Sequence, residues 1–414
     1  MDFLRSTKLC PSKLGMVWIS MWVGSAMLLV DSAWADPVPS GSAFQVNAYT
    51  TGRQLRPSVA HIGGDRFAVV WEGETTGDRF IYGRRIDGAG VLGAELFVSS
   101  STTDEQESAR VASTGDGAFL VVWEHDTSPR PAVESRRYAS DGTPSAVVTV
   151  APTLMDHSAY SPDITVDENR FVVVWEDYYP GANTFELQGR NLDGAGQLQG
   201  GVFTVVERVN GTNLSYPGLS DPAGDGFSLS WREGSDLQAQ AFDSSGMAVG
   251  STLTASNTGY DVAHTALDDG GYLVVWSESI DGLKRRRYAS DGTPSTPVVI
   301  SATSQVQRDA DVVALPDGRA AVTWRQSSSG QPPQIMMQIV AADDGAESTL
   351  TVDEASGSAA HPRLAYDAAS DELAVVWHRV GPDGDREEVY FRKYALGAIF
   401  ADGFESGDTT AWSP

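Results

Sequence analysis

The sequence predicts an all-β fold built from seven repeats of one unit. Each repeat contains an apolar run that ends in tryptophan: FAVVW, FLVVW, FVVVW, FSLSW, YLVVW, AAVTW and LAVVW. The tryptophans are separated by 45–56 residues and are Trp71, Trp123, Trp175, Trp231, Trp276, Trp324 and Trp377. Units of four short strands at this period are the signature of a β-propeller. We therefore expect a seven-bladed β-propeller with four-stranded antiparallel blades.

The first complete unit, residues 57–108, illustrates the four strands. SVAHI is followed by a Gly63-Gly64-Asp65 turn and then by RFAVVWEG, FIYGRRI and ELFVSS. Glycine in such a turn supplies the positive φ that a tight hairpin needs. The second strand is apolar at nearly every position, which predicts burial of both of its faces between neighbouring blades. A linear array of small β modules is the alternative fold.

The seventh unit lacks a clear fourth strand of its own. Near the N-terminus, FQVNAYTTGRQLRPSVA aligns with FVSSSTTDEQESARVA, the fourth strand of the first unit and its continuation. We therefore expect the N-terminal strand to complete blade seven and close the ring, with residues 398–401 as the competing candidate. The expected organisation is a signal peptide (1–35), a leader (36–43), a propeller (44–400) and a C-terminal tail (401–414). The blades are expected at 57–108, 109–161, 162–216, 217–261, 262–309, 310–361, and 362–400 together with 44–56.

The charge of the chain limits its partners. With 29 Lys and Arg against 55 Asp and Glu, the formal net charge is −26 at pH 7. A nucleic acid or an anionic membrane surface requires a basic face, so neither is an expected partner. Cationic, neutral or Ca²⁺-bridged ligands fit this charge better. We expect a monomer.

Residues 1–35 have the pattern of a secretory signal peptide. Three basic residues precede a mostly apolar run from 14 to 30, and Ala33-Trp34-Ala35 supplies the small residues of a cleavage site. Cleavage at about Ala35/Asp36 would leave a mature chain with no membrane span, secreted or in the cell envelope. An uncleaved signal anchor is the alternative. Cys10 is the only cysteine and precedes the cleavage point, so the mature chain would have no disulfide.

The repeats resemble those of a known group of proteins. The pattern F-x-V-V-W, then R-R-Y or R-R-I, then a D-G turn is similar to propeller repeats in secreted bacterial proteins of unassigned function, over about residues 44–396. The ending D-G-F-E-S-G-D-T-x-x-W-S resembles a short C-terminal tag on many exported bacterial proteins, which implies sorting or surface association. The sialidase box S-x-D-x-G-x-T-W, the Trp-Asp dipeptide and a D-x-D-x-D-G calcium run are absent from the sequence.

Two repeated columns are interpreted as structural. The tryptophans end buried strands, so we expect them to pack between blades rather than to stack on sugars. The third strands carry a polar column, Arg84, Arg136, Arg190, Gln240, Arg286, Gln338 and Arg392. We expect its arginines to pair with the carboxylates that follow the tryptophans (Glu72, Glu124 and Glu176), because both positions change together in blades four and six.

The ligand face is expected where the loops between strands two and three and between blades gather. Loops on a rigid scaffold are where binding residues concentrate. The candidate residues on this face are His125, His157, His361, His378, Tyr178 and Tyr179. The histidines have no metal-ligand spacing.

No cofactor is evident, and only one segment suggests a metal. Calcium takes six to eight oxygen ligands, whereas a single D-G turn offers one carboxylate. The loop after Trp377 is richer in acids, and Asp383, Asp385 and Glu387 are the candidate Ca²⁺ ligands.

The sequence leaves two functions open. The first is an exported binding or interaction module for an extracellular glycan or protein. The second is a hydrolase or lyase acting on extracellular polysaccharide. An enzyme needs titratable groups with perturbed pKa values that converge in one site, whereas a binding module needs only an aromatic or polar patch.

Overall fold

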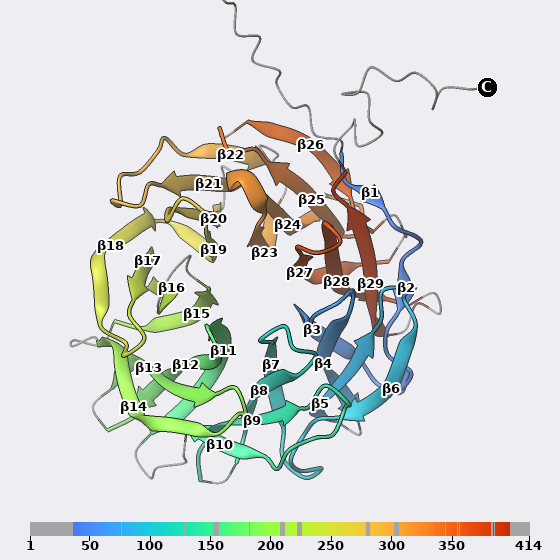
Figure 1. Cartoon of the computed structure of the whole chain (residues 1–414), viewed down its shortest axis with the longest axis vertical. Coiled ribbons are helices and arrows are strands. Elements are labelled where there is room, and N and C mark those ends of the chain that lie inside the picture. The colour runs from blue at the N-terminus through green and yellow to red at the C-terminus, as the bar shows by residue number, and fades with distance from the viewer. Residues whose placement is uncertain are drawn as a thin grey trace, which may run out of the picture. The chain divides into compact units, whose positions relative to one another are not determined.

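In a computed structural model, seven antiparallel sheets form a ring around a central channel (Figure 1). The structure describes residues 36–397 except for residues 76, 128, 152–156, 182, 208–211, 222–225, 279–281, 302–305, 344, 354, 356, 382–383 and 385. The predicted signal peptide, the C-terminal tail and residues 398–401 lie outside the described residues. The seven-bladed propeller is confirmed.

Each blade runs from the channel outward in four strands. The innermost strands are β3 (Gln54–His61), β7 (Gln106–Ala112), β11 (Ser158–Asp167), β15 (Leu214–Ser220), β19 (Gly259–Ala266), β23 (Val306–Ala314) and β27 (Ala359–Asp367). The second strands are β4 (Phe67–Thr75), β8 (Phe119–His125), β12 (Arg170–Tyr179), β16 (Phe227–Glu233), β20 (Tyr272–Glu278), β24 (Ala320–Ser327) and β28 (Glu372–Val380).

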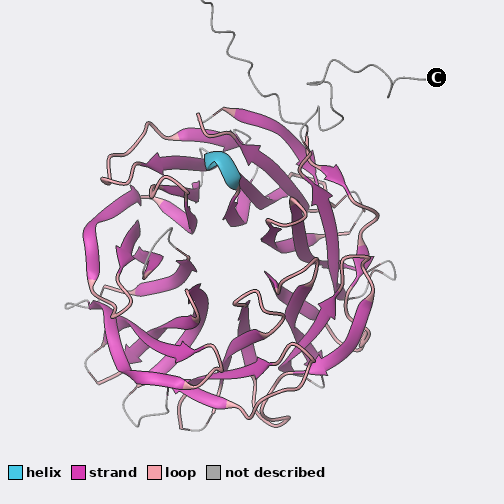
Figure 2. Ribbon diagram, in the orientation of Figure 1, coloured by secondary structure: helices cyan, strands magenta, loops and turns pink. Residues whose placement is uncertain are grey.

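The two outer layers complete the blades. The third strands are β5 (Asp78–Ile86), β9 (Ala132–Tyr138), β13 (Thr184–Asp193), β17 (Asp236–Phe242), β21 (Gly282–Tyr288), β25 (Gln334–Val340) and β29 (Glu387–Ala395). The fourth strands of blades one to six are β6 (Leu92–Phe97), β10 (Val148–Ala151), β14 (Leu198–Glu207), β18 (Ala248–Ser256), β22 (Val298–Ser301) and β26 (Ala346–Thr351). The one short helical segment among the described residues is η1 (Pro316–Gly318) (Figure 2). No helix in the described part of the chain is long and apolar enough to span a membrane.

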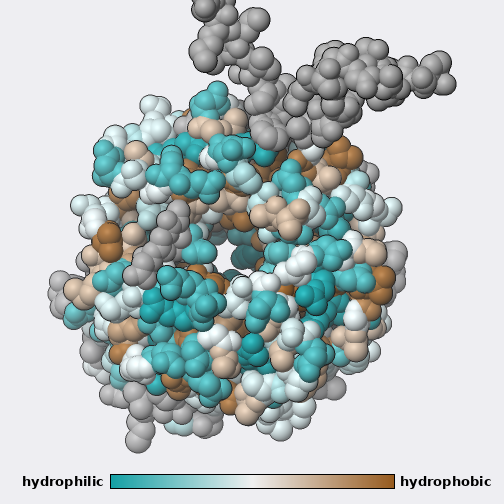
Figure 3. All heavy atoms as spheres, viewed as in Figure 1, coloured by the Kyte–Doolittle hydropathy of each residue, from teal (hydrophilic) through white to brown (hydrophobic). Residues whose placement is uncertain are grey.

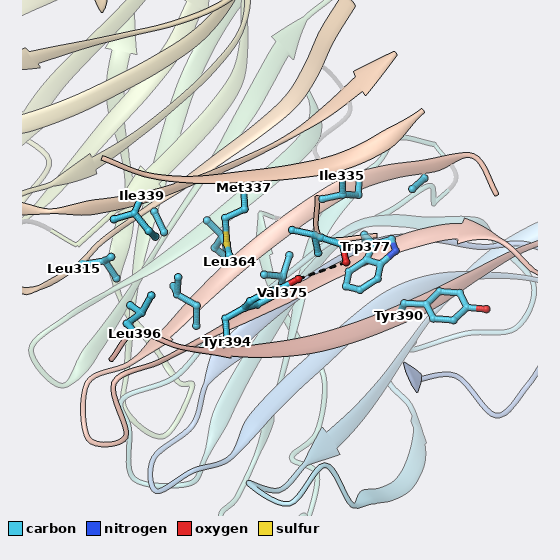
Figure 4. Packing of buried hydrophobic residues seen from close by; sticks show 14 residues of the cluster. Leu315, Ile335, Met337, Ile339, Leu364, Val375, Trp377, Tyr390, Tyr394 and Leu396 are labelled. Carbon is cyan, nitrogen blue, oxygen red and sulfur yellow. Dashed lines mark hydrogen bonds between the residues drawn. The ribbon is translucent and has the colours of Figure 1, made fainter. Parts of the chain in front are cut away.

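The second strands are buried on both faces. Val69 packs in a cluster with Val376 and Phe391 of blade seven, whereas its neighbour Val70 packs with Trp123 of blade two. All seven repeat tryptophans are at most 2% exposed, which confirms that they are core residues. Figure 4 shows the arrangement for Trp377, which lies in one cluster with Ile335 of blade six.

The N-terminal strand closes the ring, as predicted. The fourth position of blade seven is filled by two short pieces, β1 (Val38–Pro39) and β2 (Phe44–Gln45), both antiparallel to β29. The Val46 N–H donates to the Val389 carbonyl (2.8 Å), and the Val389 N–H donates to the Asn47 Oδ1 (2.9 Å). The pairing includes Val38 and Pro39, which lie in the segment predicted as a leader.

The expected ion pairs of the third-strand arginines are wrong. Arg84 lies opposite Val69 in the sheet, whereas Glu72 lies opposite Ile81, so the register separates the two side chains. Arg84 instead donates through Nη1 to the Val46 carbonyl (2.7 Å). Arg136, Arg190 and Arg392 likewise donate to the carbonyls of Val98, Val150 and Val352. The arginines therefore join the backbones of neighbouring blades.

The substitution Val46→Ala tests the closure. Val46 is fully buried where the chain ends meet, so its truncation is expected to lower the free energy of unfolding by about 1–3 kcal/mol. Val249→Ala is the matched control, because Val249 is 53% exposed on the outer strand β18, and its effect should stay within about 0.5 kcal/mol. Equal effects of the two substitutions in denaturant titrations would contradict this account of closure.

Candidate functional site

The centre of the ring is a cavity of about 1120 Å³ lined mainly by the innermost strands. Figure 3 shows the opening of the channel, with hydrophilic residues around it. Each innermost strand has one irregularity, where its register against the second strand shifts. The residue two positions after this irregularity faces the cavity. We call these residues the channel column: Ser58, Arg110, Asp163, Gly218, Ala263, Asp311 and Arg363. Each lies opposite the residue that precedes the blade's tryptophan.

The strand irregularity shapes the mouth of the channel. All seven innermost strands shift register at this point. Six of the residues there have a positive φ of 46–58°: Arg56, Ser108, Ser161, Tyr216, Asp309 and His361. A non-glycine residue adopts this conformation only when its surroundings hold it there, because it is strained.

In blades one to three, the residue after the tryptophan helps to hold that strained backbone. Glu72 accepts a hydrogen bond from the Ser108 N–H of the next blade (2.8 Å), and Glu124 does the same for Ser161 (3.0 Å). Glu176 accepts from the Tyr216 N–H (2.7 Å). The position after tryptophan thus connects neighbouring blades at the mouth of the channel.

Blade seven uses a histidine for the same connection. The Nδ1 of His378 accepts a hydrogen bond from the Arg56 N–H (3.1 Å), which fixes the ring as the tautomer with its proton on Nε2. The link from blade seven to blade one therefore depends on a neutral imidazole.

Several carboxyl groups that line the cavity have raised pKa values. Burial raises the pKa of Glu124 to about 8 and the pKa of Glu176 to about 7. Burial also raises the pKa of the neighbouring Glu107. At neutral pH the Glu124 carboxyl is therefore mainly protonated, so that it can donate a proton or a hydrogen bond.

Arginine side chains of blades six, seven, one and two gather near His361. Burial lowers the pKa of His361 well below its usual value, and Arg363, Arg56, Arg325 and Arg110 lower it further. Their joint effect indicates that all four guanidinium groups lie near this ring. Arginines therefore line this part of the channel together with acidic side chains, because Asp309 lies 3.3 Å from the His361 Nδ1 and Glu107 lies 3.3 Å from the Arg56 Nη1.

The structure brings two of the predicted site residues together. The rings of His361 and His378 lie 5.1 Å apart between their centroids. They line a second cavity of about 360 Å³, next to the channel, with Arg53, Arg56, Arg79 and Arg325 among its other lining residues. Burial, followed by the effect of His361, lowers the pKa of His378 to about 3. Both rings are therefore neutral near pH 7, and as bases they are too weak for efficient proton transfer at that pH.

The other predicted ligand-face residues lie away from both cavities. The His125 Nδ1 is 3.1 Å from the Glu134 carboxylate, and its side chain is buried in blade two. In blade three, the His157 Nδ1 is 3.0 Å from Asp177, and its ring lies 3.9 Å from that of Tyr179. Tyr178 stacks on Phe185 at 4.6 Å. A role of these residues in ligand binding stays a prediction.

The predicted calcium loop is only partly described. Asp383 and Asp385 lie outside the described residues. Glu387 is described, and its two carboxylate oxygens accept hydrogen bonds from Arg53 at 2.8 Å each. Within the described ranges, no three His, Cys, Asp or Glu side chains are grouped so that they could hold a metal ion.

Apart from His361, the residues that line the channel were not among the predicted site residues. Tyr160 and Tyr216 line the cavity, and Tyr216 is 64% exposed. Neither belongs to a repeated motif. An alignment of the seven innermost strands would have placed Tyr216 and His361 in the same column, at the irregularity. It would have placed Arg110 and Arg363 together two positions later.

The pH dependence of stability tests the environment of Glu124. The folded protein keeps a proton on Glu124 up to about pH 8, whereas the unfolded chain releases it near the usual pKa of 4.5. The stabilisation is thus fully present below about pH 4.5 and is lost as the pH rises through 8. Glu124→Gln should flatten this dependence between pH 5 and 8, by about 1.4 kcal/mol for each unit of pKa shift.

Glu72→Gln is the matched control for this measurement. Glu72 occupies the equivalent position in blade one, where the Arg79 Nη1 lies 3.1 Å and the Arg56 Nη1 3.4 Å from its carboxylate. Removing that charge should lower stability across the whole pH range. Stability is measured by thermal unfolding at pH 5 to 8. If it changes with pH equally in wild type and Glu124→Gln, the raised pKa of Glu124 is contradicted.

Comparison with known proteins supports the fold alone. Neither a protein-family model nor a curated protein matches the sequence. An ulvan lyase of a polysaccharide lyase family has a similar structure, with a TM-score of 0.57 at 10% identity, over 86% of this chain and 96% of that chain. A Dyadobacter fermentans protein of unknown function has a TM-score of 0.54 at 10% identity, over 87% of this chain and 99% of that chain. A Fusarium graminearum α-L-arabinofuranosidase has a TM-score of 0.51 at 11% identity, over 88% of this chain and 98% of that chain.

Proposed function

We propose that the protein is an exported propeller that binds a glycan at the mouth of its central channel. The observation that carries this proposal is Tyr216, an exposed aromatic side chain held by a strained backbone beside a large polar cavity. Export follows from the predicted signal peptide, and the C-terminal tail would serve as a sorting or surface tag.

The backbone of Tyr216 is held in a defined conformation. Its φ of 57° places it in the left-handed region, and its N–H is held by Glu176 at 2.7 Å. A backbone that is already ordered loses little further conformational freedom when a ligand binds. The exposed ring offers a flat apolar face with a hydroxyl at its edge, which suits the face of a sugar ring.

The rest of the mouth supplies polar groups. Asp163, Asp261 and Asp309 line the cavity and can accept hydrogen bonds from sugar hydroxyls. The cavity of about 1120 Å³ exceeds the usual range of about 300–1,000 Å³ for small-molecule sites. It therefore has room for an oligosaccharide, and the ulvan lyase and the arabinofuranosidase with this fold are themselves carbohydrate-active proteins.

The substitution Tyr216→Ala tests the glycan site. It should weaken binding of the best ligand from a glycan array by about 10-fold or more, equivalent to about 1.4 kcal/mol. It should leave the thermal midpoint nearly unchanged because the side chain is exposed. Phe97→Ala is the matched control, since Phe97 is an aromatic side chain, 41% exposed on the outer strand β6, that does not line the channel. Equal affinities for wild type and Tyr216→Ala would contradict this site.

A second candidate function is hydrolysis of the bound glycan. The raised pKa of Glu124 favours it, because a carboxyl group that is protonated at neutral pH can act as a general acid on a glycosidic oxygen. Glu176 is a second carboxyl group with a raised pKa beside the same cavity.

Turnover measurements distinguish this candidate from binding alone. If the protein is a hydrolase, Glu124→Gln should lower kcat by about 100-fold or more while glycan affinity is retained, because glutamine can still accept the Ser161 hydrogen bond. Release of reducing ends from the array ligands is the measurement. Full activity in Glu124→Gln would exclude Glu124 as the acid, and no turnover by wild type would leave the binding function alone.

A further inference from the structure

The channel column has an uneven distribution of charge around the ring. Arg363, Ser58 and Arg110 occupy consecutive blades seven, one and two, and all three line the cavity. On blades four and five the same position is filled by Gly218 and Ala263. One side of the channel therefore carries two guanidinium groups, whereas the other side has at most a methyl group at this level.

The acidic members of the column have a structural task that the arginines cannot perform. The Asp163 Oδ2 accepts the Leu219 N–H of the next blade at 2.7 Å, and the Asp311 Oδ2 accepts the Leu364 N–H at 2.8 Å. A guanidinium group has no acceptor, so Arg110 and Arg363 cannot make this link. Joining the blades does not explain why arginine occupies these two positions.

The two arginines keep most of their donors available. Among the described residues, the Arg363 guanidinium makes one hydrogen bond, from Nη1 to the Pro362 carbonyl (2.9 Å). Arg110 donates from Nη1 to the Ala109 carbonyl (3.0 Å), and its Nε lies 3.6 Å from Asp163. Each guanidinium has five N–H donors in a planar fork. The remaining donors are available to a ligand in the cavity.

The two positive charges lie close enough to repel each other. Burial and then Arg363 lower the pKa of Arg110, whereas Asp163, Glu72 and Asp311 partly oppose that change. Arg56, at the irregularity of blade one, lines the same cavity, and its Nη1 lies 3.4 Å from Glu72 and 3.3 Å from Glu107. Like charges in a partly desolvated channel are stabilised by an anion bound between them.

We propose that Arg110 and Arg363, with Arg56 nearer the mouth, bind an anionic substituent of the ligand, either a carboxylate or a sulfate ester. This inference rests on the proposed glycan site and specifies its ligand as an acidic sugar. The guanidinium fork matches the oxygens of both groups. Gly218 and Ala263 leave space across the channel for the sugar ring that carries the anion.

Matched oligosaccharides that differ only in charge test the proposal. Trigalacturonate is compared with its methyl ester, and a sulfated carrageenan oligosaccharide with its desulfated form, by calorimetric titration at constant ionic strength. Wild type should bind the charged member of at least one pair about 10-fold more tightly or better. The pair that shows this preference identifies the substituent as carboxylate or sulfate.

Three arginine variants locate the effect. Arg110→Gln and Arg363→Gln should each remove most of the preference for the charged member. Arg130→Gln is the control, because it removes the same charge from a residue outside both cavities. Circular dichroism and the thermal midpoint establish that each variant is folded before its binding is compared.

The outcomes separate this inference from the proposed function. Equal affinity for charged and neutral members, with both weakened by Tyr216→Ala, would overturn the anionic ligand but leave glycan binding intact. If no glycan binds, the proposed function fails, and thermal shifts with inorganic sulfate decide the anion site. A sulfate-induced shift smaller in Arg363→Gln than in wild type and Arg130→Gln supports the site. The same shift in all three proteins overturns it.

Discussion

The second strand of each blade needs a neighbour on both of its faces. In blade one, Val69 is covered by blade seven and Val70 by blade two. An isolated blade would expose both apolar faces, and a blade at the end of an open array would expose one of them to water. The requirement is met for every blade only when the array closes on itself. The N-terminal strand therefore does more than add hydrogen bonds to β29, because it fixes the relation between the first blade and the last.

This core leaves the innermost strands free to carry a site. Several of their channel-facing residues do not join neighbouring blades, so Ser58, Arg110, Gly218 and Ala263 can occupy equivalent positions in one ring. The backbone there is held by hydrogen bonds from the preceding blade, such as that between Glu124 and Ser161. The scaffold thus fixes the position of a side chain at the mouth of the channel, whereas the residue type at that position can vary. Tyr216 and His361 occupy the same structural position with different chemical properties.

The parts of the molecule that the sequence predicts correctly are those with local, repeated signals. The seven tryptophan runs determine the number of blades and identify the buried strands, and the alignment of residues 44–60 with 97–112 identifies the closing strand. The predicted carboxylate partner of Arg84 was wrong, because strand register decides which side chains lie side by side. Register is not visible in the sequence of a single strand. Most channel residues, Tyr216 and Arg110 among them, were missed for a related reason. Which side chains face the channel depends on the register shift in the innermost strand. Serine is not a residue type that indicates a left-handed backbone, although Ser108 and Ser161 both adopt one.

The closing strand also determines the order of events when the chain folds. The hydrogen bond between Asn47 and Val389 spans 342 residues of sequence, so it can form only after nearly the whole propeller has been synthesised. Contacts this distant in sequence form slowly, because a long loop must close first. Until then β29 has an unpaired edge, and such an edge can associate with other chains. The earliest residues of the propeller to be made are therefore among the last to reach their final position.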